Sequence, residues 1–281
     1  MGEFHSKPYV YVGEVNIKVK DLENSVAFYE TIIGLQVLEK GEGRAVLTAD
    51  GETPLVTLEQ PEDVISKAGR TTGLYHFAIL LPTRADLSVF LRHLLETGYP
   101  LGAADHYVSE ALYLNDPDGN GIEVYRDRPA DEWTWKNGMV DMATEQLDAQ
   151  GILAASDAEW KGLPAETLMG HIHLHVADLQ QAEEYYTKGL GFERVATYPQ
   201  AAFLSTGKYH HHIAINTWQG VGAPTPPRNS IGLNWYTLVF LDTSVREAVV
   251  KQLQQLGAPI TKEHDYYLTN DPAGNQIRLV V

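Results

Sequence analysis

Cysteine is absent from this 281-residue chain. A chain without thiols forms no disulfide, and any transition metal that it binds must be held by histidine and carboxylate side chains. Ligands of both kinds are plentiful, because the chain has 11 histidines and 37 aspartate and glutamate residues. Proteins without disulfides are typical of the reducing cytoplasm, and a cytoplasmic location is therefore our expectation.

Long apolar runs and an excess of basic residues are missing too. No apolar run approaches the roughly 18 residues that a membrane helix needs, and the polar stretch from Met1 to Pro8 leads us to expect no secretory signal. Lysine and arginine number only 21, which gives a formal net charge of −16. Nucleic acids and anionic membranes bind basic surfaces, so the sequence disfavours both as partners.

The chain does contain a pattern that occurs four times. The segment Asn115–Glu123 returns with few changes at Asn270–Arg278. The segment Val19–Leu22, with the aromatic pair and the glycine that follow it, returns 157 residues later at Val176–Leu179. Each copy begins with an alternating β-rich segment, continues at helical spacing to a glycine, and closes with short β-rich segments. The repeat predicts four βαβββ units of about 50 residues each.

These four units define the expected organisation of the chain. They begin near Val10, Gly73, Gly170 and Gly232. We expect an α+β fold with two tandem domains of two units each, residues 9–127 and residues 169–281, in which curved mixed sheets enclose clefts. Residues 128–168 are predicted to form a linker that contains a helix at about Asp141 to Ala149.

The motifs resemble those of a known superfamily. They are the Asp-Leu helix start with its aromatic pair at Phe28-Tyr29, the strand start His76-Phe77-Ala78-Ile79, and the turn Asp116–Asn120 before Ile122-Glu123. Together they resemble the vicinal oxygen chelate superfamily, also called the glyoxalase/bleomycin-resistance/extradiol-dioxygenase fold. Within it, the chain resembles the two-domain catechol 2,3-dioxygenases of bacilli. The segments that carry this likeness are 73–81, 108–113, 170–175 and 209–212.

The resemblance implies two metal-ligand positions in each unit. One lies on the first strand, seven residues before the start of the helix, and the other lies on the last strand, four residues after a turn glycine. In chain order the paired positions are Glu14 and Leu55, His76 and Glu123, His171 and His211, and Trp235 and Arg278. Units two and three therefore carry ligand-type side chains at both positions, and unit four carries none.

A cleft forms between two facing units, and the resemblance allows two pairings. If neighbouring units pair, one cleft holds Glu14 with His76 and Glu123, and the other holds His171 and His211. If the pairing crosses the domains, units two and three bring His76, Glu123, His171 and His211 into one cleft. We favour the crossed pairing, because it gathers the good ligands. Two histidines and one carboxylate suit Fe(II) in non-haem oxygenases, although Mn, Zn and Ni accept the same ligands.

The spacing of the histidines bears on which of them face the cleft. Alternate histidines from His171 to His175 share one face of a strand, and burying such groups without partners costs free energy, so they are poor core residues. The histidines from His210 to His212 are consecutive. The glycine count directs His211 into the cleft, whereas a slip of one residue would direct its two neighbours there instead.

Further candidates lie close to the ligand positions. Extradiol enzymes carry a histidine and a tyrosine ahead of the last ligand, and His106 and Tyr113 lie 17 and 10 residues before Glu123. Without such a function, His106 would be an ordinary surface-loop residue and Tyr113 an ordinary aromatic residue of a strand. His173 is a candidate for acid–base catalysis near the metal. The aromatic residues that could line a ring-binding pocket, or belong to the core, are Trp218, Trp235 and Tyr236.

As a function, the resemblance implies extradiol cleavage of a small aromatic diol with Fe(II) and O2. Two alternatives remain open. A glyoxalase-type isomerase would hold Zn or Ni with four protein ligands, including His211, and a metal-free protein of the bleomycin-resistance type would use the cleft only as a pocket. The better-known extradiol enzymes place ligands in unit four, where this chain has Trp235 and Arg278, so the location of the site is open as well. Open sheet edges would also allow a homo-oligomer.

Overall fold

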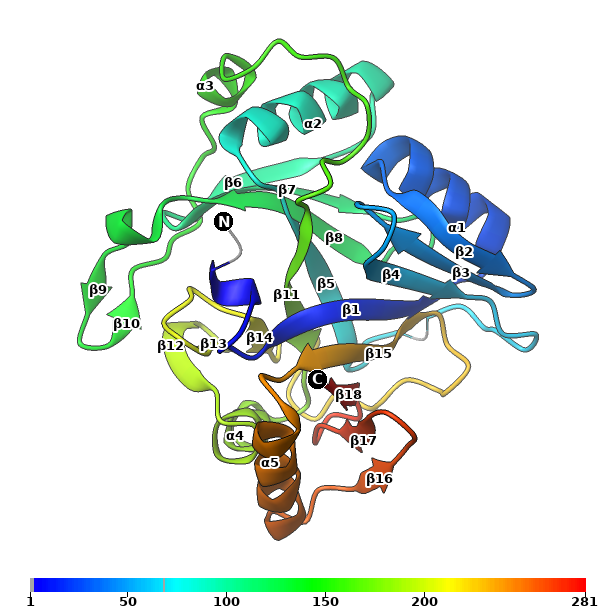
Figure 1. The fold of residues 1–281 in the computed structure, drawn as a ribbon, viewed down its shortest axis with the longest axis vertical. Coiled ribbons are helices and arrows are strands. Elements are labelled where there is room, and N and C mark those ends of the chain that lie inside the picture. Colours follow the sequence, from blue (N-terminus) through cyan, green and yellow to red (C-terminus); the bar gives the residue numbers. More distant parts are fainter. Residues whose placement is uncertain (1–2, 68) are drawn as a thin grey trace.

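The framework of the protein is a pair of eight-stranded mixed sheets (Figure 1). The computed structural model describes residues 3–67 and 69–281. Each sheet is built from two βαβββ units, one from each half of the sequence. The predicted α+β fold and the crossed pairing are confirmed. The ranges 9–127 and 169–281 thus describe the order of the repeats along the chain, while neither range forms a sheet by itself.

The first sheet joins unit one to unit four. Its strands are β1 (Tyr11–Lys18), β2 (Gln36–Gly41), β3 (Arg44–Thr48), β4 (Pro54–Glu59), β15 (Gly232–Val239), β16 (Ile260–Lys262), β17 (Tyr267–Asn270) and β18 (Gln276–Val280). Their spatial order is β16-β17-β18-β15-β1-β4-β3-β2. The units meet where β1 and β15 pair antiparallel, and within each unit the first strand pairs parallel to the last.

The second sheet repeats this plan with units three and two. Its strands are β5 (Gly73–Leu80), β6 (Gly102–Asp105), β7 (Ser109–Asn115), β8 (Gly121–Asp127), β11 (Leu168–His175), β12 (Glu193–Tyr198), β13 (Ala201–Ser205) and β14 (Ile213–Asn216). Their order is β12-β13-β14-β11-β5-β8-β7-β6. The antiparallel pair β5 and β11 stands at the centre, so the first strands of units two and three lie side by side.

Each unit contains one main helix, and each helix begins at a side-chain cap. The helices are α1 (Leu22–Phe28), α2 (Arg84–Thr97), α4 (Leu179–Glu184) and α5 (Thr243–Gln255). The caps are Asp21, Thr83, Asp178 and Asp242, whose side chains accept a hydrogen bond from a backbone N–H three residues on. Because all four units share this start, the residue seven positions before each cap is structurally equivalent. These residues are Glu14, His76, His171 and Trp235.

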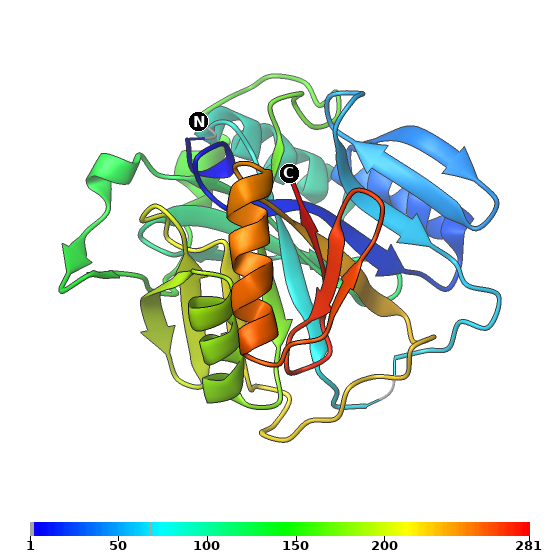
Figure 2. The same ribbon diagram turned by 60° about the horizontal axis from the view of Figure 1, so that its bottom comes forward.

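Units that are neighbours in the sequence meet through their helical segments. Short π-helical turns, Tyr29–Ile33 and Tyr185–Gly189, extend α1 and α4. His93 of α2 is hydrogen bonded to the Thr31 carbonyl at 3.0 Å, which connects units one and two. In units three and four, α4 and α5 lie side by side (Figure 2), and Leu253 packs close to Gly189. No helix in the described ranges is both long and apolar enough to cross a membrane.

The linker is mostly extended, and its helix is displaced from the predicted position. It contains a short hairpin, β9 (Trp135–Lys136) and β10 (Met139–Val140), and a helix α3 (Ala149–Leu153). The prediction of a helix at Asp141 to Ala149 was wrong. Backbone groups of this stretch bond instead to the end of β6: Glu145 donates its N–H to the Asp105 carbonyl at 2.9 Å and accepts the Asp105 N–H at 3.0 Å. These long-range hydrogen bonds replace the local bonds of a helix.

Candidate metal centre and cavity

Three predicted ligands meet at the centre of the second sheet. His76 lies on β5, Glu123 on β8 and His171 on β11, and all three are buried. Oε2 of Glu123 lies 3.1 Å from Nε2 of His76 and 3.2 Å from Nε2 of His171. One ligand atom from each residue lies within 4.8 Å of the others. The crossed pairing creates this group, because only then do β5 and β11 become neighbours.

The chemistry of these three groups suits a divalent metal. His76 Nε2 is buried and has no hydrogen-bond partner of good geometry. Burial lowers the pKa of His171 to about 4, despite the opposing effect of Glu123, so the imidazole is neutral at pH 7. Burial alone would raise the pKa of Glu123, but the facing imidazoles outweigh it and hold this pKa well below its usual range. A buried carboxylate beside two imidazoles is a fitting donor set for a transition metal.

The structure places His211 away from the predicted ligand position. Glu123 pairs in parallel register with Ala78 of β5, and the equivalent pair in unit three joins Ala214 to His173. His211 lies three residues earlier, in the connection between β13 and β14. The glycine count failed because this connection is longer than the turn before Glu123. The same count was wrong in unit one, where the equivalent residue is Thr57 and not Leu55.

His211 nevertheless lies next to the three candidate ligands. Its ring centroid is 4.1 Å from that of His171. His210 donates its Nε2–H to Asp127 at 2.7 Å, so its Nδ1 accepts the Nδ1–H of His211 at 2.8 Å. This chain of hydrogen bonds leaves Nε2 of His211 with a free lone pair. Burial and the neighbouring imidazoles lower the pKa of His211 well below its ordinary value, which keeps that lone pair unprotonated.

His106 and Tyr113, predicted as a pair, are brought into contact. The Tyr113 hydroxyl lies 2.6 Å from His106 Nε2, while His106 Nδ1 donates to the Ala143 carbonyl at 2.6 Å. Since Nδ1 carries the proton, Nε2 accepts and the tyrosine hydroxyl donates. Tyr113 also packs against His76, with ring centroids 5.7 Å apart. Burial and the charge of Glu123 raise the pKa of Tyr113 well above its ordinary value, so the hydroxyl keeps its proton.

His173 is oriented by the side-chain amide of Asn216, a residue that was not predicted from the sequence. Asn216, at the end of β14, accepts the backbone N–H of Trp218 at 3.0 Å and the Nδ1–H of His175 at 2.7 Å through its Oδ1. Its amide nitrogen therefore donates to Nε2 of His173 at 2.8 Å. The neutral His173 imidazole is left with its proton on Nδ1.

The equivalent positions of the first sheet hold a different arrangement. The Thr57 hydroxyl donates to the Glu14 carboxylate at 2.5 Å, and the guanidinium of Arg278 lies 3.5 Å from the Trp235 ring centroid. A cation already occupies the place that Glu123 has in the second sheet. In the described residues, no group of three ligand-type side chains forms there.

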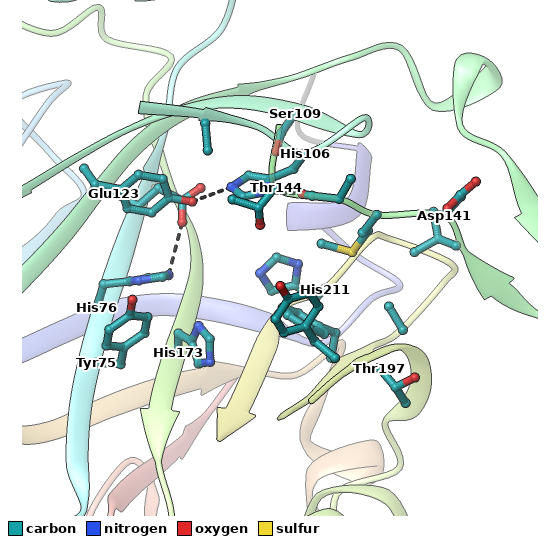
Figure 3. A pocket seen from close by; sticks show the side chains of 18 of the residues that line it. Tyr75, His76, His106, Ser109, Glu123, Asp141, Thr144, His173, Thr197 and His211 are labelled. Atoms are coloured by element: carbon teal, nitrogen blue, oxygen red, sulfur yellow. Dashed lines mark hydrogen bonds and ion pairs between the residues drawn. The ribbon is translucent and has the colours of Figure 1, made fainter. Parts of the chain in front are cut away.

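A cavity of about 530 Å³ opens beside the three ligands (Figure 3). Strands of units two and three line it together with linker residues 139–144. Of the candidate side chains, the cavity is lined by His76, His106, Tyr113, Glu123, His173, His211 and Trp218. Trp235 and Tyr236 do not line it, because both belong to the first sheet. Trp235 packs against Arg278, and Tyr236 is a core residue bonded to the Tyr186 hydroxyl at 2.9 Å.

Known proteins share both the sequence pattern and the fold. The chain is 43% identical over 277 residues to a catechol-2,3-dioxygenase from Bacillus subtilis (strain 168), covering 96% of this chain and 97% of the relative. It is 27% identical over 159 residues to biphenyl-2,3-diol 1,2-dioxygenase 3 from Rhodococcus globerulus, covering 54% of this chain and 83% of that protein.

Solved structures with little sequence identity share the architecture. A putative dioxygenase from Bacillus subtilis superposes with a TM-score of 0.67 at 12% identity, covering 98% of this chain and 86% of that one. Glyoxalase I from Zea mays gives a TM-score of 0.56 at 16% identity, covering 96% and 92%. The sequence profile of one family matches residues 11–124 and 168–279, which together make up most of the chain. The chain belongs to the Glyoxalase/Bleomycin resistance protein/Dioxygenase superfamily.

Proposed function

We propose that this protein is an extradiol dioxygenase, which opens a catechol-type aromatic diol with O2 at a non-haem Fe(II) centre. The observation that carries the proposal is the buried group of His76, Glu123 and His171 at one end of a large cavity. Two histidines and one carboxylate leave open coordination positions for a diol and for O2. The relative with 43% identity over nearly its whole length, a catechol-2,3-dioxygenase, supports the same reaction.

Under this proposal the three ligands hold the iron, and the residues around them handle protons. When bound, Fe(II) would act as a template and Lewis acid for the diol and as a redox partner for O2. His211 has a free Nε2 lone pair in the cavity, which suits it to take a proton from a diol hydroxyl. We therefore assign acid–base chemistry to His211, with Asp127 and His210 fixing its tautomer. The Nδ1–H of His173 can donate to a bound oxygen atom, whereas the Tyr113 hydroxyl already donates its proton to His106.

The glyoxalase-type alternative depends on a fourth protein ligand. The equivalent position in unit three is Ala214, which offers no ligand atom, and His211 is not part of the group whose ligand atoms lie within 4.8 Å of one another. Both observations favour a three-ligand centre. The alternative keeps a distinct signature, because it would bind Zn or Ni tightly and consume no O2.

Metal content and oxygen uptake test the proposal together. Protein purified without oxygen would be assayed for Fe, Mn, Zn and Ni, then supplied with Fe(II) and catechol. We expect O2 consumption with formation of the yellow ring-cleavage product, and loss of both in His76→Ala. Tightly bound Zn or Ni with no O2 uptake over a panel of catechols would reject the dioxygenase.

Removing the Tyr113 hydroxyl should slow the reaction while the metal stays bound. Tyr113 orients His106 and faces the His76 ring, so its loss should disturb the surroundings of the ligands but none of the ligands themselves. We expect Tyr113→Phe to lower kcat/KM by about 10- to 100-fold with iron content unchanged. Tyr99→Phe is the matched control, because that hydroxyl bonds to the Asn115 carbonyl outside the cavity. Equal activity in both variants would exclude a role for Tyr113.

A further inference from the structure

The linker forms a wall of the cavity opposite the metal ligands. Residues 133–147, here called the strap, run between the two outer strands of the second sheet. At one end they bond to Asp105 of β6, and at the other Trp133 and Val140 pack with Val195 of β12. Figure 3 shows Asp141 of the strap and Thr197 of β12 at the far end of the cavity from His76 and Glu123. The strap thus closes the space between the two edges of the sheet.

The strap lies outside the repeated units. The family profile stops at residue 124 and resumes at residue 168, so it leaves the strap out. The metal ligands come from the repeated strands, whereas much of the wall opposite them comes from the strap. The candidate ligands and this wall therefore come from different parts of the sequence.

The part of the cavity lined by the strap and β12 has several apolar side chains and no cation. The apolar side chains there include Met139, Val140, Met142 and Ala196. Among the described residues that line the cavity, none is lysine or arginine, and the carboxylates are Glu123 and Asp141. Lys136 lies 3.3 Å from Asp141, but its side chain is 73% exposed and does not line the cavity. A bound anion would meet no positive side chain at this end.

The cavity is also large for a single aromatic ring. A volume of about 530 Å³ falls in the range of roughly 300–1,000 Å³ that pockets for drug-sized ligands occupy. With the diol at the metal, the remaining space extends toward the strap. An unsubstituted catechol would leave that apolar space filled only by water.

We infer that the substrate is a catechol with a bulky, neutral, apolar substituent such as an aryl group, and that Met139 and Met142 of the strap bind this substituent. The inference rests on the proposed ring cleavage and specifies which diols are preferred. A ring buried against these side chains gains apolar contact. A carboxylate in the same place would lose its hydration without a partner and would face Asp141.

The preference is measured with diols matched in position and differing in charge. Using enzyme loaded with Fe(II), kcat/KM would be compared for 3-phenylcatechol and 2,3-dihydroxybenzoate, and for 4-methylcatechol and 3,4-dihydroxybenzoate. Because even one methylene in an apolar pocket changes specificity by about tenfold or more, we expect 3-phenylcatechol to exceed both benzoates at least tenfold. Turnover of catechol with equal or better turnover of the benzoates would overturn the inference and leave the dioxygenase standing. Failure of every diol would reject the dioxygenase itself.

Two variants of strap residues test whether the strap causes the preference for an apolar substituent. Met142→Ala should lower kcat/KM for 3-phenylcatechol about tenfold and change that for catechol less than about twofold. Met139→Lys places a cation in the wall and should raise the turnover of 2,3-dihydroxybenzoate relative to 3-phenylcatechol. Thr134→Ala, an exposed strap residue outside the cavity lining, is the control. Uniform effects on all diols in both methionine variants would overturn the assignment.

A binding measurement tests the contribution of the strap to diol affinity in the absence of the ring-cleavage reaction. Calorimetry with metal-free protein should detect tighter binding of 3-phenylcatechol than of 2,3-dihydroxybenzoate, since the apolar wall persists without the metal. The difference should shrink in Met142→Ala. Equal affinities of the metal-free protein for both diols would count against the strap as the source of the preference.

Discussion

Glu123→Ala is expected to abolish both iron binding and ring cleavage. Glu123 is the one carboxylate of the ligand group, and its Oε2 lies within 3.2 Å of both histidine nitrogens. Without it, two imidazoles would have to hold the metal with no anion to balance its charge. A bound metal contributes several kcal/mol of transition-state stabilisation, and roughly 4 kcal/mol corresponds to about a thousandfold in rate. We therefore expect kcat/KM to fall at least about a thousandfold.

The first sheet supplies a matched control for this variant. Glu14 occupies the first-strand ligand position of unit one and is also a partly buried strand glutamate, but its carboxylate is bonded to Thr57. Glu14→Gln should retain full iron content and activity. Iron content by elemental analysis and circular dichroism would be measured for both variants. A folded Glu123→Ala protein that still binds stoichiometric iron would show that the metal lies elsewhere.

The fold and the meeting of the central candidate ligands could be predicted because the chain repeats itself. The four similar units could be compared with one another. The distribution of ligand-type residues among them favoured the crossed pairing that the sheets show. The first-strand positions were reliable, because each lies seven residues before a helix cap and the intervening strand has constant length. His76 and His171 were located in this way.

The errors came from segments whose length varies between units. The distance from a turn glycine to the last strand is not constant, so counting from Gly207 selected His211 in place of Ala214. The linker helix was misplaced because Glu145, in the segment predicted to be helical, bonds through its backbone to Asp105, some 40 residues away in sequence. Local patterns cannot reveal such a partner. Asn216 and Asp127 were missed for the same reason, because each bonds to a histidine that is distant in the sequence. Asn216 bonds to His173, and Asp127 bonds to His210.

Glu110→Ala is expected to cause the largest loss of stability. The Glu110 side chain is 1% exposed, and it accepts hydrogen bonds from Arg84 at 2.9 Å and from Arg126 at 2.7 Å. Arg84 also donates to the Gly151 carbonyl of α3, so the cluster connects β7, β8, α2 and the linker. Removing one partner of a buried ion pair costs about 3–5 kcal/mol. The arginines are partly exposed, which favours the lower end, about 3 kcal/mol.

Thermal unfolding would measure this loss. A change of about 3 kcal/mol in a chain of this size should lower the Tm by roughly 5 °C. Glu184→Ala is the control, because Glu184 and its partner Lys188 form an exposed pair within one helical segment, and such pairs usually contribute less than about 1 kcal/mol. Equal Tm values for the two variants would contradict a stabilising role of the Glu110 cluster.

The pH dependence of the Tm gives a second, independent test of this prediction. Burial alone would raise the pKa of Glu110, but the hydrogen bonds from Arg84 and Arg126 outweigh it and lower the pKa in the folded protein. A depressed carboxylate pKa stabilises the folded state fully above the pKa of the unfolded chain, and this contribution is lost as the pH falls through the folded value. The Tm difference between the wild-type protein and Glu110→Ala should therefore be largest near neutral pH and shrink in acid. A difference that stays constant as the pH falls from 7 to below the folded pKa of Glu110 would mean that packing, and not the charge of Glu110, accounts for the loss.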